Sequence, residues 1–290
     1  MKRTITAYMV ATIVSFAVIG GLTIQPLSSM AQQEEQGQQQ EEEEQGQQQQ
    51  EEQGQQQQQE EQTESITQVT NAACGQVVEG LVELNSDLNC TGDGLIVGAD
   101  GTTIRLNGHT IRGPGPDSSK VGISVGNQDG VTIEGPGTIE QFQAGILASG
   151  ARGTSISLAT LRENQIAVFS TGTEDLQAMQ NIITQNSIGT ASHSSNGLQL
   201  TENLVTGNQL AGITFVNTRE SMVSTNNVLE SQNGIFVDPQ SSDNTIESNN
   251  VLRNTVDLNN ANGLATNVNN NGYSDNNCET SNPSGLCIGR

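Results

Sequence analysis

Charged and imidazole side chains recur at one turn of a repeating unit in this sequence. They are Asp129, Arg152, Glu174, His193, Arg219, Glu220, Asp238 and Asp243. If the units stack, equivalent turns lie about 5 Å apart, so these side chains gather in a column on one outer face. Carboxylate oxygens spaced in this way suit a hard cation such as calcium, or the hydroxyl groups of a sugar. The alternative interpretation, a column of solvated turn residues, is the one that the sequence favours.

The donors that softer metals prefer are scarce. His109 and His193 are the two histidines, and they lie 84 positions apart (193−109), several units from each other. Copper binds through His, Cys or Met, and no Cys-x-x-Cys pair offers a zinc site. We therefore expect no resident metal or other cofactor, with calcium in the turn column as the alternative left open.

The four cysteines lie at the two ends of the repeating region. They are Cys74, Cys90, Cys278 and Cys287. Four cysteines allow three connectivities, of which only Cys74–Cys90 with Cys278–Cys287 keeps both bridges local. Each local bridge closes a loop of roughly 10–17 residues and stabilises the fold by about 3 kcal/mol. An even count in an exported chain favours disulfides.

The elements that position these residues belong to an internal repeat. Successive copies begin at Asn181, Asn203, Asn227 and Asn250, which are 22, 24 and 23 residues apart (203−181, 227−203, 250−227). Each copy holds three short apolar segments of alternating pattern, which predicts strands with one buried face. Such short strands are stable only when the units stack. We therefore predict an all-β fold, a single-stranded right-handed parallel β-helix with three sheets, about 22 residues per coil and disulfide-stapled ends.

Asparagines in the turns predict two structural ladders. Asparagine tolerates left-handed backbone at a tight turn, and its amide can bond to the asparagine above and below. One ladder is predicted to contain Asn181, Asn203, Asn227 and Asn250. The other is predicted to contain Asn186, Asn208, Asn233 and Asn254.

The chain divides into three parts of different composition. Residues 1–31 have a basic start, an apolar run and small residues before a cleavage point, which is typical of a secretory signal peptide; an uncleaved membrane anchor is the alternative. Residues 32–73 form a Gln/Glu-rich linker that we expect to be disordered, because it cannot bury an apolar face. Residues 74–290 form the predicted β-helix domain. We expect it to be secreted or on the cell surface, with membrane contact only through an uncleaved N-terminal segment.

The formal net charge of −22 argues against a nucleic-acid partner. Binding to a phosphate backbone requires clustered Lys and Arg. Basic residues are only scattered through residues 74–290.

The first units resemble a known family. The stretch from Cys74-Gly75 through Cys90 to Gly94-Leu95-Ile96-Val97-Gly98, followed by Leu106-Asn107-Gly108-His109-Thr110-Ile111, resembles the first coils of exported right-handed parallel β-helix proteins with a pectate-lyase-like fold. That superfamily includes the NosD-like periplasmic proteins associated with copper. The resemblance covers about residues 74–290 and implies the fold. It implies no single activity, because the superfamily mixes lyases, hydrolases, epimerases and binding proteins.

The catalytic residues of those enzymes are missing from the sequence. The Asn-Thr-Asp, Asp-Asp, Gly-His-Gly and Arg-Ile-Lys set of pectin hydrolases is absent, and Asp238-Pro239 is not followed by the His-Glu that resembles an alginate epimerase. The alternating pattern places Phe215 inward, and Phe169 and Phe236 outward as a small sugar-stacking patch. The sequence thus favours a non-enzymatic protein that binds or organises extracellular material, such as polysaccharide or cell-envelope components. A polysaccharide lyase, hydrolase or epimerase with an unrecognised site is one alternative, and a periplasmic metal-handling protein is another.

Overall fold

The computed structural model describes residues 68–69, 71–261 and 270–287. All described residues belong to the second of two units of the chain, Ser65–Arg290. The segment predicted as a signal peptide or anchor, residues 1–31, and most of the linker predicted for residues 32–73 lie outside the described residues. Across the described ranges, no helix has the length and apolar character needed to span a membrane.

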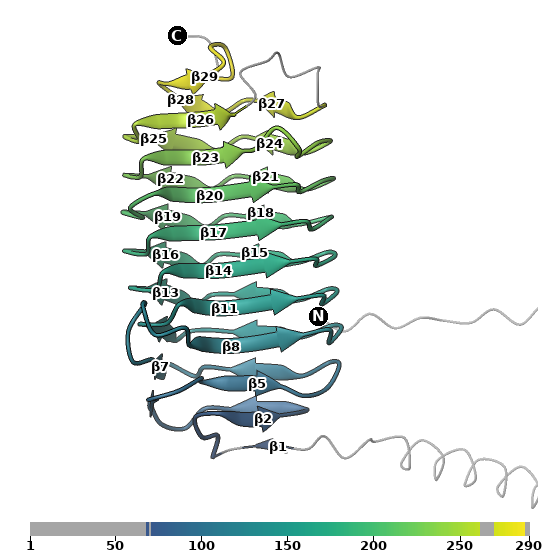
Figure 1. Ribbon diagram of the computed structural model, residues 1–290, viewed down its shortest axis with the longest axis vertical. Helices are drawn as coiled ribbons and strands as arrows, with labels where there is room; N and C mark the ends of the chain where they lie inside the picture. Colours follow the sequence, from purple (N-terminus) through teal and green to yellow (C-terminus); the bar gives the residue numbers. More distant parts are fainter. Residues whose placement is uncertain (1–67, 70, 262–269, 288–290) are drawn as a thin grey trace, which may run out of the picture. The chain divides into compact units, whose positions relative to one another are not determined.

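The second unit is a solenoid of short parallel strands stacked coil upon coil (Figure 1). Its strands form three sheets, named here A, B and C. Sheet A contains β1 (Gln68–Val69), β3 (Leu81–Glu83), β6 (Thr103–Arg105), β9 (Thr132–Glu134), β12 (Ser155–Ser157), β15 (Gln177–Met179), β18 (Gln199–Thr201), β21 (Met222–Ser224), β24 (Thr245–Glu247) and β27 (Gly272–Ser274). Sheet B contains β2 (Gln76–Val78), β5 (Leu95–Val97), β8 (Val121–Gly126), β11 (Ala144–Ser149), β14 (Ile166–Thr171), β17 (Ile188–His193), β20 (Ala211–Val216), β23 (Asn233–Val237), β26 (Val256–Asn260) and β29 (Ser281–Asn282). Sheet C contains β4 (Leu88–Asn89), β7 (Thr110–Arg112), β10 (Thr138–Glu140), β13 (Thr160–Arg162), β16 (Ile182–Thr184), β19 (Leu204–Thr206), β22 (Asn227–Leu229), β25 (Asn250–Leu252) and β28 (Asn277–Cys278).

Each coil passes from sheet A to sheet C and then to sheet B, so the solenoid has three corners. Central coils advance by 22 or 23 residues, for example from Asn186 to Asn208 and from Asn203 to Asn226. The predicted β-helix with three sheets and about 22 residues per coil is therefore confirmed. The coil that contains β7 and β8 is longer, with 29 residues between the paired Arg105 and Glu134, because a loop of residues 113–120 is inserted between these two strands.

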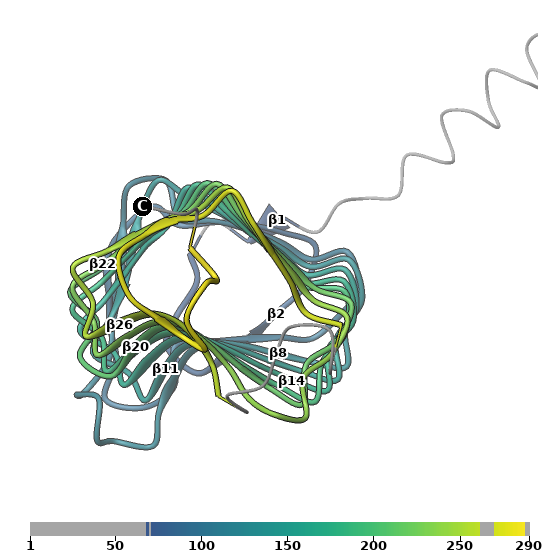
Figure 2. The same cartoon turned by 90° about the horizontal axis from the view of Figure 1, so that it is seen from above.

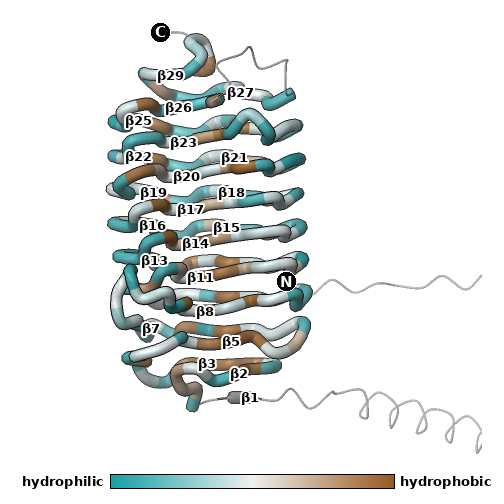
Figure 3. The backbone as a smooth tube through the Cα atoms, viewed as in Figure 1, coloured by the Kyte–Doolittle hydropathy of each residue, from teal (hydrophilic) through white to brown (hydrophobic). Residues whose placement is uncertain are grey.

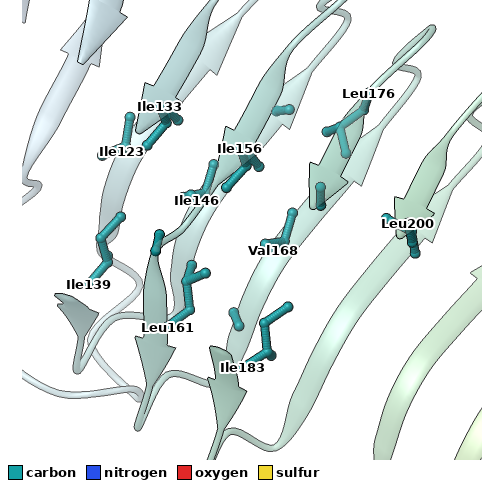
Figure 4. Packing of buried hydrophobic residues seen from close by; sticks show 14 of the residues in the cluster. Ile123, Ile133, Ile139, Ile146, Ile156, Leu161, Val168, Leu176, Ile183 and Leu200 are labelled. Carbon is teal, nitrogen blue, oxygen red and sulfur yellow. The ribbon is translucent and has the colours of Figure 1, made fainter. Parts of the chain in front are cut away.

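The hydrophobic core is a stack of aliphatic side chains enclosed by the three sheets (Figure 4). Ile139, Leu161 and Ile183 follow one another in register along sheet C and are almost completely buried. Phe215 points inward and is fully buried, as predicted. The same inward position recurs on every coil, so short strands acquire a continuous core only through stacking.

A first ladder of buried asparagines lies at the corner between sheets C and B. The Nδ2 of Asn164 donates to the Oδ1 of Asn186 at 3.2 Å, and Asn186 donates in the same way to Asn208 at 3.0 Å. The predicted membership of Asn233 is wrong. The coil of β23 places Ser231 at this position, where its backbone N–H donates to the Oδ1 of Asn254 at 2.9 Å. Asn233 instead begins β23 and accepts a hydrogen bond from its outer neighbour Asn259 at 2.9 Å.

A second ladder lies at the corner between sheets A and C. Its members are Asn181, Asn203, Asn226, Asn249 and Asn276, joined through their amides at 2.9–3.1 Å. The prediction of Asn227 and Asn250 in this ladder is wrong by one residue. They begin β22 and β25, and the Nδ2 of Asn250 donates to the Oδ1 of Asn227 at 2.8 Å in a separate ladder. Asn-Asn doublets leave the register ambiguous in the sequence, and a one-residue slip moves a side chain to the other face.

The left-handed backbone conformation falls on the residue before each ladder asparagine. Gln180, Gln185 and Glu202 have φ values of 57°, 58° and 58°. The expectation that the ladder asparagine itself would take this conformation is therefore wrong. The preceding residue makes the bend, which turns the asparagine side chain inward to bond with its neighbours in the adjacent coils.

Disulfides lie near both ends of the solenoid, with the predicted connectivity. Cys74 is bonded to Cys90, and Cys278 to Cys287, with Cα–Cα distances of 5.5 and 5.2 Å. The C-terminal segment crosses the end of the solenoid in Figure 2, where Leu286 is 6% exposed and packs on the core. Both predicted staples are confirmed.

Candidate functional site

The predicted column of turn residues lies at the corner between sheets B and A, with some changes of membership. Residues paired from coil to coil there are Asp129, Arg152, Glu174, Asn196, Arg219 and Ser242. Four predicted members are therefore brought together. His193 is not among them, because it ends β17 and pairs with Thr171 and Val216 inside sheet B. Asn196 occupies the position expected for His193.

Glu220 and Asp243 flank this column, whereas Asp238 is removed from it. The Oε2 of Glu220 accepts a weak hydrogen bond of 3.4 Å from Asn196. Asp243 accepts hydrogen bonds from Ser242 and Asn270 at 2.8 and 3.1 Å, and these hold its pKa below the ordinary value. Asp238 is 8% exposed, and its Oδ1 accepts four hydrogen bonds inside its own turn and from Asn217. Asp238 thus stabilises its own turn through hydrogen bonds.

Opposite charges alternate along the column. Arg152 lies between Asp129 and Glu174 and forms an ion pair with Glu174. In the part of the chain that the structure describes, no three His, Cys, Asp or Glu side chains gather as a metal-binding group. The Arg152–Glu174 pair therefore neutralises the charges of two adjacent coils of the column.

Two adjoining hollows lie at a different corner, between sheets C and B. Their volumes are about 400 and about 340 Å³. The first is lined by Pro116, Gln141, Glu163, Asn164, Gln185, Asn186, Ser187, Gly207 and Gln209. The second is lined by Val121, Gln143, Ala144, Leu147, Gln165, Ile166, Phe169, Ser187, Ile188 and Leu210. Ser187 belongs to both, so we treat them as one site, called the corner groove.

The inserted loop of residues 113–120 forms one wall of the corner groove. Figure 2 shows this loop projecting from the corner between sheets C and B. The backbone N–H groups of Gly113 and Gly115 donate to the carbonyls of Glu140 and Gln141, both at 2.9 Å, and fix the loop to the next coil. Pro116 at its tip lines the first hollow.

A buried carboxylate holds the base of this loop. Glu140 is 1% exposed although it faces outward from β10. Its two oxygens contact the Nε of Arg112 at 2.5 Å and the Nη2 of Arg162 at 2.6 Å, on the strands to either side. A buried carboxylate is stable only when it is paired in this way. Since Arg112 immediately precedes the loop, this cluster fixes the direction in which the loop leaves the sheet.

The floor of the groove is apolar. Val121, Ala144, Ile166 and Ile188 follow one another in register at the start of consecutive sheet-B strands. Leu147 and Phe169 form a second pair in register on the same outer face. Figure 3 shows apolar colour on β5, β8, β11 and β14, to which inward and outward residues both contribute. Phe169 is half-buried and faces outward, as predicted, and so is Phe236 three strands further along the same row.

Glutamine amides form the rim. Gln143, Gln165, Gln185 and Gln209 are exposed, and within the described residues their side chains make no hydrogen bond. Glu163 is the one charged lining residue, and both of its oxygens are engaged, by Gln141 at 3.1 Å and by Arg162 at 3.4 Å. The groove therefore presents free neutral donors and acceptors beside an apolar surface. This site was not among the sequence predictions, although the long coil and the recurrent glutamines are signals of it.

Comparison with known proteins identifies a family. The sequence profile of the periplasmic copper-binding protein (NosD) family matches residues 86–286. No functionally curated protein has significant sequence similarity to the chain.

Solved structures that resemble this one have low sequence identity to the chain. A periplasmic alginate epimerase AlgG mutant is 13% identical, with a TM-score of 0.48 over 69% of this chain and 60% of its own. DFA-IIIase from Arthrobacter chlorophenolicus A6 is 15% identical, with a TM-score of 0.45 over 69% and 64%. Tailspike protein 2 of bacteriophage CBA120 is 15% identical, with a TM-score of 0.42 over 74% and 38%. The chain thus spans less than two thirds of the length of each.

The side chains described here do not fit the copper named by the family description. His109 lies at the corner between sheets A and C and contacts the carboxylate of Asp87, whereas His193 lies in sheet B several coils away. All four cysteines are in disulfides and offer no thiolate. Copper prefers nitrogen and sulfur ligands grouped around one point, and among the described residues no three His, Cys, Asp or Glu side chains gather in this way.

Proposed function

We propose that this chain, which belongs to the periplasmic copper-binding protein (NosD) family, is a non-enzymatic extracytoplasmic protein that binds glycan in the corner groove. The observation that carries the proposal is the outward Phe169 beside free glutamine amides in a hollow of about 340 Å³. A sugar ring presents an apolar C–H face to an aromatic or aliphatic surface and hydroxyl groups to amides at its edge. The groove offers both kinds of contact side by side.

The described lining of the groove lacks the pair of carboxylates that glycoside hydrolases ordinarily use. Glycoside hydrolysis requires two carboxylates about 5–9.5 Å apart, and Glu163 is the one carboxylate among the lining residues that the structure describes. Its oxygens already accept hydrogen bonds from Gln141 and Arg162. A single carboxylate in the groove supports binding without hydrolysis.

The location outside the cytoplasm is supported by two independent features. The matched family is periplasmic. Two disulfides lie near the ends of the solenoid, and such bonds persist in oxidising compartments. A groove that opens on the outer face of a disulfide-stapled rod is then accessible to polysaccharide of the cell envelope or its surroundings.

A binding experiment with a matched control tests this proposal. Phe169→Ala removes the aromatic surface of the groove, and Phe236→Ala makes the same change on the same face of sheet B outside the groove. We expect Phe169→Ala to weaken glycan binding about tenfold, corresponding to about 1.4 kcal/mol, and Phe236→Ala to leave it unchanged. Binding is measured on a glycan array and then by calorimetry.

Three results would contradict the proposal in different ways. Cleaved or epimerised product in mass spectra of the bound glycan would favour the enzyme alternative. Loss of binding with a calcium chelator would move the site to the turn column around Glu174. Equal loss in both Phe variants would remove the corner groove as the site.

A further inference from the structure

The charges around the corner groove are neutralised by the protein itself. Lys120, which immediately precedes the lining residue Val121, pairs with Asp93 at 3.4 Å. Arg162 lies between Glu140 and Glu163 and contacts both. No Lys or Arg is among the residues that line the hollows in the described structure. An acidic sugar would therefore lose hydration at its carboxylate without gaining a cation, which is unfavourable.

The free amides lie close to the apolar floor. Gln143 and Gln165 immediately precede Ala144 and Ile166, which pair in register, so the two glutamines occupy equivalent positions about 4.8 Å apart. Each side-chain amide offers both a donor and an acceptor. A ligand amide carries its N–H donor and C=O acceptor on separate atoms of a rigid plane, so it can bond to both glutamines of such a row at once, whereas a hydroxyl donates and accepts at a single atom.

The floor next to these amides suits a methyl group. Ala144 is 5% exposed and Ile166 is half-buried, and both line the same hollow as Gln143 and Gln165. Leu147 and Phe169 continue the apolar surface along the strands. A substituent that ends in a methyl group next to an amide therefore meets both parts of the groove at once.

From this juxtaposition we infer that the ligand of the corner groove is an uncharged glycan that carries N-acetyl groups. The acetamido N–H and C=O pair with the side-chain amides of Gln143 and Gln165, its methyl group contacts Ile166, and the sugar ring lies on Phe169. This inference rests on the proposed function, because it specifies which glycan the same groove takes. It excludes uronic acid polymers as the preferred ligand.

Three oligosaccharides of equal length separate the chemical classes. Binding of the full purified chain is measured by calorimetry with chito-oligosaccharide, cello-oligosaccharide and oligogalacturonate. The first two share a backbone and differ in the acetamido group, and the third carries carboxylates. We expect the chito-oligosaccharide to bind at least about tenfold more tightly than the cello-oligosaccharide, and the oligogalacturonate to bind more weakly than either.

A charge-changing variant places the effect in the groove. Gln165→Glu replaces an amide by a carboxylate of nearly the same shape, and we expect it to weaken chito-oligosaccharide binding about tenfold. Gln199→Glu makes the same change at an exposed position on sheet A and serves as the control. Equal binding of the chito- and cello-oligosaccharides, or preferred binding of the uronate, would overturn the inference and leave the proposed function standing. Failure of every glycan to bind would overturn the proposed function as well.

Discussion

The side-chain amide of Asn186 donates to the side-chain oxygen of Asn208 on the next coil at 3.0 Å. Both residues are almost completely buried, with exposed fractions of 2% and 0%. The Oδ1 of Asn186 also accepts the backbone N–H of Asn164 at 2.9 Å. One side chain thus satisfies polar groups on two neighbouring coils where no water is available.

Replacement of Asn186 by Ala is therefore expected to destabilise the solenoid by about 2–3 kcal/mol, because buried N–H and C=O groups lose their partners. The control is Asn227→Ala, which removes an amide from the separate, more exposed ladder of Asn227 and Asn250. Because water can replace the lost amide there, this variant should cost less than about 1 kcal/mol. Urea unfolding followed by circular dichroism measures both. Equal losses in the two variants would show that burial of the ladder is unimportant for its strength.

Glu140 should contribute both to the stability of the fold and to the position of the loop that borders the corner groove. Glu140→Gln leaves Arg112 and Arg162 without their shared anion, and we expect a loss of about 1–3 kcal/mol, moderated because both arginines reach solvent. Glu134→Gln breaks a similar pair with the exposed Arg105 and should cost no more than about 0.5 kcal/mol. The same unfolding assay compares them.

Proteolysis within the loop of residues 113–120 is a second measurement on these variants. Because Glu140 fixes the strand end from which residues 113–120 leave, Glu140→Gln should also raise the rate of proteolysis within this loop, while Glu134→Gln should not. An unchanged cleavage rate in Glu140→Gln would show that the ion pairs of Glu140 do not fix the position of the loop.

Reduction of the disulfides should destabilise the ends of the solenoid. The bridges close loops with sequence separations of 16 and 9 residues, and each stabilises the fold by about 3 kcal/mol in chain-entropy estimates. The double variant Cys74→Ser with Cys90→Ser is expected to lower the unfolding midpoint and to become insensitive to reductant at that end. If reductant lowered the midpoint of this variant as much as that of the parent chain, the N-terminal bridge would contribute little.

Tyr273 is expected to make the stability of the fold depend on pH at alkaline values. Its hydroxyl is buried and has no hydrogen-bond partner in the described structure, and this burial raises the pKa of Tyr273 above its ordinary value of 10.0. Since the folded state favours the neutral form, the stability from this group is present below pH 10 and is lost as the pH rises further. Tyr273→Phe should remove this alkaline loss and leave stability at pH 7 unchanged or higher by up to about 1 kcal/mol.

Unfolding midpoints between pH 7 and 11 measure the effect of Tyr273. The parent chain, measured over the same pH range, is the reference. An alkaline loss of stability that persists in Tyr273→Phe would assign it to other groups.

Much of the fold follows from local patterns. The apolar alternation and the 22-residue spacing from Asn181 to Asn203 predict strands that have to stack, because three-residue strands cannot form a stable sheet alone. Alternation also placed Phe215 inward and Phe169 outward correctly. The disulfide connectivity followed because only one pairing keeps both bridges local.

The register at the corners could not be obtained in this way. Asn226-Asn227 and Asn249-Asn250 are doublets, and the choice between their members depends on which one the preceding left-handed residue turns inward. For the same reason, the sequence prediction placed His193 in the turn column, at a position where the structure has Asn196. Coils that differ by one residue shift such positions without any change in the apolar pattern.

By itself, the sequence determined the repeated coil, its three strands, its buried face and the stapling of its ends, because these depend on periodicity and on residues near one another in the chain. Only the tertiary structure decided where a ligand could bind. The corner groove combines Pro116 from an inserted loop, Phe169 from one strand and Gln209 from a turn two coils further on. Such a surface exists only after stacking has set the register and the loop has been anchored on Glu140, so no single segment contains its signal.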